Sequence, residues 1–218
     1  MPETKHGYAA LVNAPNLLTL SRVLLAIVFF VIIPLGGRWD TSHQSFWYLT
    51  ALVIFLLAIL TDWLDGYVAR KYHLETAFGR ISDPFVDKLL VCGAFIMFAI
   101  YLAGNPYMIS ESGRHFHLAN IAPWMAVIIT AREFLISALR GFAESRNIKF
   151  GANVWGKQKM AFQSIAICAI LAQQAIFNYR PAFAAAATVL IWLAVVSTIL
   201  SGVLYIFRAK KVLKNEPA

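Results

Sequence analysis

The sequence has few charged residues and few cysteines for its length. Of its 218 residues, 14% are charged and 60% are hydrophobic. Soluble domains carry about a quarter charged residues, so this composition argues against a water-exposed surface. The two cysteines, Cys92 and Cys168, both fall in apolar segments and form no CxxC pair. They exclude a disulfide framework and a cysteine metal site, and we expect both to pack in the core.

The chain also lacks an internal repeat, a low-complexity linker and the pattern of a cleavable signal peptide. Its first sixteen residues are polar, include Glu3 and are broken by Pro2 and Pro15. A signal peptide would instead place a short apolar core before a small-residue cleavage site. We therefore expect a single membrane-embedded domain over residues 1–218, with a juxtamembrane segment at 1–16 and a basic cytoplasmic tail at 208–218.

Long apolar runs dominate what is present. Each is close to the roughly 20 apolar residues that a helix needs to cross a bilayer. Sheets with open edges are not tolerated in lipid, because their backbone groups would be unpaired. The expected fold class is therefore an all-α integral membrane protein with six transmembrane helices. The six runs cover residues 17–35, 45–68, 84–103, 121–141, 157–177 and 183–207.

The distribution of basic residues predicts the orientation of these spans. Of the 19 Lys and Arg residues, three (Arg38, Arg114 and Arg180) fall in the loops opposite the termini, and the other 16 lie on the side of the termini. By the positive-inside rule, the termini and residues 62–87 face the cytoplasm of a multi-pass protein in the inner (plasma) membrane. The net charge of +8 thus reports topology, and nucleic acid is not an expected partner.

Four carboxylates lie where a membrane protein should tolerate none. Asp62 and Asp65 end one apolar run, and Asp83 and Asp87 begin the next. Ionisable groups at membrane depth are costly and therefore indicate a functional site. Spacings of three and four residues place each pair on one helix face, and an intervening turn could aim both pairs at one point. Converging carboxylates need a cation between them, and hard divalent ions such as Mg²⁺ prefer oxygen ligands.

The same segment carries a resemblance. It reads D-x-x-D-G-x-x-A-R, then eight residues, then G-x-x-x-D-x-x-x-D. Eight fixed positions over 26 residues resemble the signature of the CDP-alcohol phosphotransferase family. This resemblance implies an integral membrane enzyme that moves a phosphatidyl or similar group from a CDP-linked donor to an alcohol, releasing CMP. Members of the family are commonly homodimers.

The resemblance also implies roles for individual residues. Two Mg²⁺ or Mn²⁺ ions would be bound by Asp62, Asp65, Asp83 and Asp87. The last of these acids, Asp87, would also take the proton of the acceptor hydroxyl. The CDP moiety would lie against Asp62, Gly66, Ala69, Arg70 and Gly79.

Some of these residues have a structural interpretation as well. Asp83 precedes Pro84, and an Asp N-cap followed by proline is an ordinary helix start, which is compatible with metal binding. A glycine inside a helix lowers the stability of the helix by about 1 kcal/mol relative to alanine. Gly66 and Gly79 therefore need a reason, and a close approach of the nucleotide to the backbone provides one. The guanidinium of Arg70 could extend to lipid headgroups, but one turn beyond Asp65 it is well placed to bind a diphosphate.

A second group of charged residues is basic. Arg132 lies well inside its span, and Lys157 and Lys159 open the next one. We expect these three to form an anion site near the acids, because an acceptor with its own phosphate would need one. Glu133 is adjacent to Arg132 and should not face it on the helix; the alternative is an ion pair between Glu133 and Arg140. Residues assigned to the acceptor phosphate are Arg132, Arg140, Lys157, Lys159 and Arg22, with membrane anchoring as the alternative for Arg22.

Three runs outside the signature refine the resemblance. They start at Asn13, Arg132 and Trp155, and they look like those of the bacterial phosphatidylglycerophosphate synthases, a branch of the family. That branch transfers the phosphatidyl group of CDP-diacylglycerol to sn-glycerol 3-phosphate. Alternatives are another acceptor (inositol phosphate, serine or phosphatidylglycerol) or, from a different class, a cation transporter that uses the four acids. A transporter predicts internal pseudo-symmetry, and no repeat is visible.

Overall fold

Helices account for nearly all of the described chain. The structure, a computed structural model, describes residues 14–38, 41–72, 77–102, 107–109, 115–117, 121–146, 154–177 and 180–214. These residues form the helices α2 (Ala14–Arg38), α3 (Thr41–Tyr72), α4 (Ala77–Tyr101), α5 (Pro123–Ser145), α6 (Val154–Ala175) and α7 (Pro181–Lys214), with two short strands, β1 (Tyr107–Ile109) and β2 (His115–His117).

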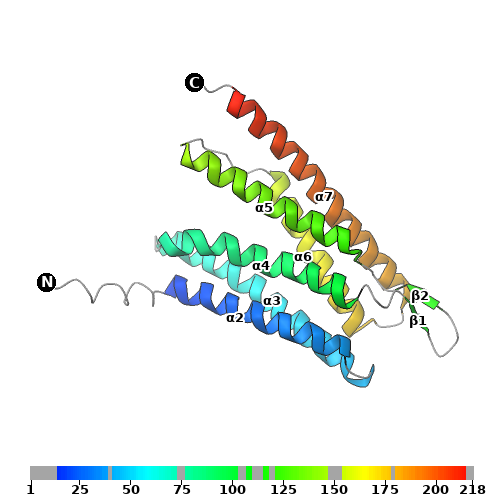
Figure 1. Ribbon diagram of the computed structural model, residues 1–218. Coiled ribbons are helices and arrows are strands. Elements are labelled where there is room, and N and C mark those ends of the chain that lie inside the picture. Colours follow the sequence, from blue (N-terminus) through cyan, green and yellow to red (C-terminus); the bar gives the residue numbers. More distant parts are fainter. Residues whose placement is uncertain are drawn as a thin grey trace.

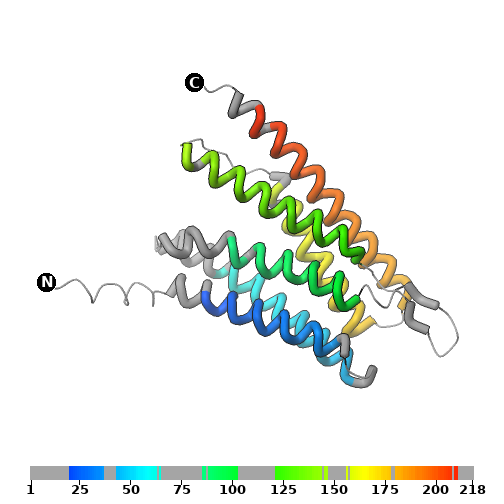
Figure 2. The backbone as a smooth tube through the Cα atoms, in the orientation of Figure 1, coloured from blue at the N-terminus to red at the C-terminus, as the bar shows by residue number. Residues whose placement is uncertain are grey.

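Consecutive helices run in alternating directions. The ends of α3, α5 and α7 therefore lie at the same end of the molecule as the starts of α2, α4 and α6 (Figure 1). The backbone tube shows the same to-and-fro path (Figure 2). Helix α6 packs against α3, α4 and α7, while α2 packs against α3 and α4. Helix α6 thus joins the first three helices to the last two.

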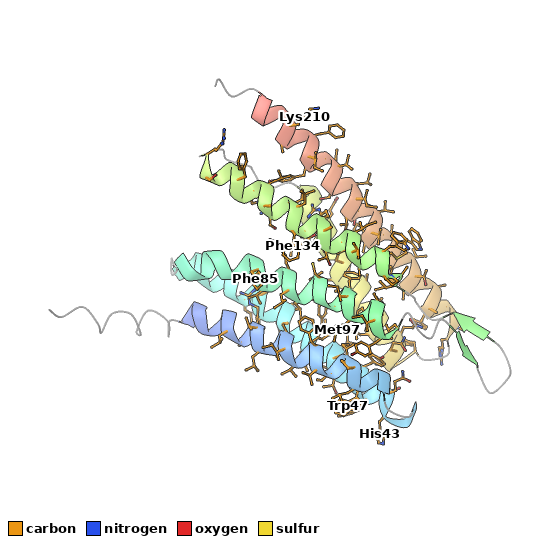
Figure 3. All side chains as sticks on the ribbon, in the orientation of Figure 1. His43, Trp47, Phe85, Met97, Phe134 and Lys210 are labelled. Carbon is orange, nitrogen blue, oxygen red and sulfur yellow. The ribbon has the colours of Figure 1, made fainter. Side chains whose placement is uncertain are left out.

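Both the interior and the outer surface of the helical bundle are apolar. The interior is filled by large side chains that are fully buried, including Phe29, Phe55, Phe95, Phe98, Ile167 and Leu171. The exterior carries apolar side chains that are more than half exposed, including Leu20, Ile100, Val127 and Phe207. Figure 3 labels two more exposed examples, Phe85 on α4 and Phe134 on α5. A surface of this kind, spread over several helices, is typical of a protein surrounded by lipid.

Within the described residues, two helices are long and apolar enough by composition to cross a membrane. They are His43–Asp62 within α3 and Pro181–Phe207 within α7, with mean hydropathies of 1.9 and 2.4. Shorter apolar stretches occupy Leu20–Gly36 and Lys88–Tyr101. This finding supports a membrane protein, and the number of helices that cross the bilayer stays a prediction.

The six helices expected from the apolar runs are confirmed as helices, but most extend beyond those runs. Helix α3 continues to Tyr72, and α7 continues through Lys214, so the basic tail expected from residue 208 begins inside a helix. Lys and Arg are good helix formers, and the end of an apolar run therefore does not end a helix. The expectation of an all-α fold needs one addition, because β1 and β2 form an antiparallel hairpin at the end of the molecule opposite the start of α2 (Figure 1).

The expected helix start at Asp83 is wrong. Helix α4 begins at Ala77, so Asp83 and Pro84 lie inside it rather than at its first turn. Proline lacks the N–H that would bond to the carbonyl four residues earlier, and it is best tolerated near a helix start. The helix nevertheless extends seven residues before Pro84. An N-cap role for Asp83 is thereby excluded as the reason for its position.

Gly93 marks a close approach between α4 and α2. A Cβ atom at Gly93 would overlap with the Phe30 ring, whereas a Cβ atom at Gly141 would meet nothing within 4 Å. Replacing either helical glycine gains about 1 kcal/mol of helix propensity. At Gly93 the overpacking costs about 1–3 kcal/mol and should outweigh this gain.

We therefore expect Gly93→Leu to lower the melting temperature of the detergent-solubilised protein relative to the matched control Gly141→Leu. Truncating the opposing ring with Phe30→Ala should recover part of the loss in the double variant. Thermal unfolding monitored by circular dichroism measures both effects. Equal melting temperatures for the two leucine variants would contradict the close packing of α2 and α4.

Candidate functional site

The acidic segment occupies facing ends of two consecutive helices. Asp62, Asp65, Gly66, Ala69 and Arg70 lie in the last part of α3, and Gly79, Asp83 and Asp87 lie in the first part of α4. These parts of α3 and α4 are at the same end of the molecule (Figure 1). Both helices pack against α2 and α6. The backbone is therefore consistent with acids that converge from two helices, as the spacing predicts.

Of the four acids, the structure describes the side chain of Asp62 only. The side chains of Asp65, Asp83 and Asp87, and those of the nucleotide-contacting residues Gly66, Ala69, Arg70 and Gly79, lie outside the described residues. Among the side chains that are described, no group of three or more His, Cys, Asp or Glu is close enough to hold a metal. The convergence of the carboxylates on a metal thus stays a prediction.

Asp62 is held by a buried arginine from another helix. Nη1 of Arg22 on α2 donates to Oδ1 of Asp62 on α3. Arg22 is only 4% exposed, while the Asp62 side chain is 42% exposed. The alternative of Arg22 as an exposed anchor for lipid headgroups is therefore wrong. Its observed partner is the first acid of the signature, and this pair fixes α2 to the acidic end of α3.

The basic residues are organised around an acid that the sequence analysis did not assign to the site. Oε1 of Glu133 accepts from Nζ of Lys159 and from Nη1 of Arg132, the latter at 3.2 Å. Nη2 of Arg132 donates to Oγ of Ser201 on α7. These four residues, hereafter the Glu133 cluster, join α5, α6 and α7 (Arg132, Glu133, Lys159 and Ser201). Their side chains are deeply buried, with Lys159 at 4% and Glu133 at 9%.

Two expectations about Glu133 are corrected by this geometry. Adjacent residues point in different directions from a helix, but the long Arg132 side chain curls back far enough to reach the neighbouring carboxylate. The alternative ion pair between Glu133 and Arg140 is not formed: Glu133 binds Lys159 and Arg132, while Arg140 is exposed. The side chain of Lys157 lies outside the described residues.

The Arg132 side chain is also shaped by α7. A Cβ atom at Gly202 would lie 3.1 Å from Cγ of Arg132. A glycine at this position lets the arginine stem lie directly on the α7 backbone, next to the hydroxyl of Ser201. Helices α5 and α7 pack against each other, so this contact sets where the guanidinium lies.

The Glu133 cluster lies near the acidic helix α4. Helix α4 packs against both α5 and α6, which carry Glu133 and Lys159. The helix that contains Asp83 and Asp87 therefore borders the two helices that contain most of the cluster. The cysteines are free, with Cys92 buried and Cys168 half-buried, as expected.

The sequence contained one signal for Glu133. An acid well inside an apolar helix requires a partner, and a basic residue at the start of the neighbouring span is the natural candidate. Ser201 gave no such signal, because serines are common at close helix contacts in membrane proteins.

The sequence is similar to a family of known proteins. The sequence profile of the CDP-alcohol phosphatidyltransferase family matches residues 12–200. The chain is 34% identical to the CDP-diacylglycerol–glycerol-3-phosphate 3-phosphatidyltransferase of Bacillus subtilis, over 93% of this chain and 98% of the relative. It is 32% identical to the protein of the same name from Haemophilus influenzae, over 91% and 94%. It is also 34% identical to a CMP-forming cardiolipin synthase of Oryza sativa, over 75% of this chain and 47% of the relative.

The family profile covers most of the chain, which is a helical protein with an apolar exterior. The chain belongs to the CDP-alcohol phosphatidyltransferase family. The expected family resemblance is thereby confirmed.

Proposed function

We propose that this chain transfers the phosphatidyl group of CDP-diacylglycerol to sn-glycerol 3-phosphate, producing phosphatidylglycerol phosphate and CMP. The observation that carries the proposal is the near full-length similarity to bacterial proteins named for this reaction. The Glu133 cluster supports the choice of acceptor. Its two cations surround one carboxylate, which leaves positive charge for a phosphate that the acceptor itself brings.

The acceptor hydroxyl oxygen attacks the phosphorus that bears the diacylglycerol. The bond from this phosphorus to the CMP oxygen breaks, and the electron pair leaves with CMP. The hydroxyl proton passes to Asp87, which we assign as the base. Most of the acceleration in such phosphoryl chemistry comes from positioning and electrostatics. Arg70 would bind the diphosphate, and Gly66, Ala69 and Gly79 would leave room for the nucleotide.

The four aspartates fit a divalent metal because their hard carboxylate oxygens are the ligands that Mg²⁺ and Mn²⁺ prefer. The donor set comprises Asp62, Asp65, Asp83 and Asp87. Two ions bound there would neutralise the donor's diphosphate and stabilise the charge on departing CMP. The contact of Arg22 with Oδ1 of Asp62 orients this carboxylate from the side of α2.

We propose that all six helices cross the inner membrane. The shortest, α6, has 22 residues, which corresponds to about 33 Å and covers the roughly 30 Å hydrocarbon core. With six spans, the acidic segment shares its side of the membrane with 16 of the 19 basic residues, and the alternating helices support this arrangement (Figure 1). The active site then faces the cytoplasm, the compartment that contains nucleotides. A homodimer is expected from the family resemblance.

This topology predicts different labelling of two positions that are exposed in the structure. His43 at the start of α3 and Lys210 near the end of α7 lie at opposite ends of the molecule (Figure 3). In intact cells, His43→Cys should react with an impermeant thiol reagent, and Lys210→Cys should react only after permeabilisation. The unsubstituted protein, whose cysteines lie within apolar helices, is the control. Labelling of Lys210→Cys alone would place the acidic end outside.

The proposed reaction is tested by following CMP release from CDP-diacylglycerol with purified protein. Addition of sn-glycerol 3-phosphate should start CMP release, and the lipid product should carry a phosphate monoester. Omitting the acceptor should reduce the rate to hydrolytic background. Absence of acceptor-dependent CMP release would contradict the proposal.

The similarity to the cardiolipin synthase of Oryza sativa favours one second candidate, in which phosphatidylglycerol is the acceptor. Its product would have two phosphodiesters and no monoester, so the same product analysis separates the two reactions. From the sequence alone, serine or inositol phosphate as acceptor and cation transport are further alternatives. Family membership favours an enzyme over a transporter.

A further inference from the structure

Glu133 joins two cations that come from two different helices. Its Oε1 atom accepts from both Lys159 on α6 and Arg132 on its own helix α5. Arg132 is held on its other side by the Ser201 hydroxyl of α7. The Arg132 guanidinium is therefore fixed at two points, and the Lys159 ammonium at one. This single carboxylate oxygen determines how far apart the two positive groups lie.

The Glu133 cluster contains more positive than negative charge. Two cations and one carboxylate leave one positive charge, and the side chains are at most 11% exposed. A net charge away from water is costly unless a counter-ion binds. In addition, Nε of Arg132 is buried and has no hydrogen-bond partner within the part of the chain that the structure describes. Both features fit a site that is completed by an anion.

We infer that Glu133 is the positioning residue of the acceptor site. Its carboxylate keeps Arg132 and Lys159 close together, despite their repulsion, and oriented to bind the phosphate of the acceptor, which Glu133 itself does not touch. This inference rests on the proposed function, since it assumes a phosphorylated acceptor. It explains why an acid is retained inside a site whose task is to bind an anion.

The test is a kinetic comparison of Glu133→Gln with the wild type in detergent, with each substrate varied in turn. The apparent KM for sn-glycerol 3-phosphate should rise about tenfold or more, because two charge-assisted contacts lose their common anchor. The KM for CDP-diacylglycerol should change by less than about twofold. A purely structural role would lower the amount of active enzyme, and hence the maximal rate, without changing either KM.

A double-mutant cycle shows whether Glu133 acts through Lys159. Glu133→Gln should raise the acceptor KM by a smaller factor once Lys159→Gln is present, because one of the two groups that it positions is gone. Multiplicative effects of the two substitutions would contradict positioning. Gln163→Met is the matched control: Gln163 lies one turn after Lys159, is buried, and donates to Thr198 of α7 at 3.0 Å. Its loss should leave the acceptor KM unchanged.

Glu133→Asp covers the case in which Glu133→Gln does not fold. It keeps the charge but withdraws the carboxylate by one methylene, about 1.5 Å, and should also raise the acceptor KM. A folded variant with an unchanged acceptor KM overturns the inference while the proposed function stands. A wild-type enzyme that shows no response to sn-glycerol 3-phosphate overturns the proposed function instead.

Discussion

Asp65→Asn and Asp83→Asn are each expected to lower the rate of CMP release by at least about a hundredfold, because each removes a charged ligand from the proposed metal site. The amide is nearly the same size as the carboxylate, so the helices should remain folded. Rates are measured with saturating CDP-diacylglycerol and sn-glycerol 3-phosphate, and folding is checked by gel filtration in detergent. Glu144→Gln, an acid outside the signature, is the matched control and should retain wild-type activity.

Metal removal gives an independent form of the same prediction. EDTA should abolish CMP release by the wild type, and added Mg²⁺ or Mn²⁺ should restore it. Turnover that persists in EDTA, or Asn variants that retain near wild-type rates, would contradict the assignment of the four aspartates to a metal site.

Arg132→Ala is expected to raise the apparent KM for sn-glycerol 3-phosphate by about one to two orders of magnitude. Loss of a charge-assisted contact with a phosphate costs about 1.5–3 kcal/mol, and each 1.4 kcal/mol corresponds to about a factor of ten. The KM for CDP-diacylglycerol should be nearly unchanged. Arg132→Lys keeps the charge but not the two-sided contact with Glu133 and Ser201, so its KM should be intermediate.

Arg146→Ala is the matched control for this series. Arg146 directly follows α5, is exposed, and lies over the Phe142 ring at 5.0 Å instead of joining the Glu133 cluster. Its acceptor KM should equal that of the wild type. If Arg132→Ala raised both substrate KM values equally, Arg132 would belong to the donor site or to the fold in general.

The helices of this protein could be predicted from sequence because apolar runs of about 20 residues have few alternatives in lipid. Their ends could not. The long apolar run of α7 stops at Phe207, yet the helix continues to Lys214, since basic residues favour helix as much as they favour the membrane surface. Asp83 and Pro84 resembled a helix start, and the structure places them inside α4.

The residue types of the candidate site could be predicted from the sequence, but the ion pairs that these residues form with one another could not. The spacing of the four aspartates identified the acidic segment, and Arg132 and Lys159 were recognised as a basic group. Rules for helix faces describe where Cβ atoms point, and they failed for Glu133 because a long arginine side chain can return to its neighbour. From its place near a span end, Arg22 is assigned to the acceptor phosphate with membrane anchoring as the alternative, and only tertiary contacts revealed its partner Asp62.

The identity of the acceptor is the central claim, and competition among acceptors tests it most directly. Purified protein is given CDP-diacylglycerol with sn-glycerol 3-phosphate, glycerol, serine, inositol phosphate or phosphatidylglycerol, and kcat/KM for CMP release is compared. We predict that sn-glycerol 3-phosphate has the highest value and that glycerol, which lacks the phosphate, is a poor acceptor. A higher kcat/KM with serine, inositol phosphate or phosphatidylglycerol would contradict the proposed function, even with the metal-dependent chemistry intact.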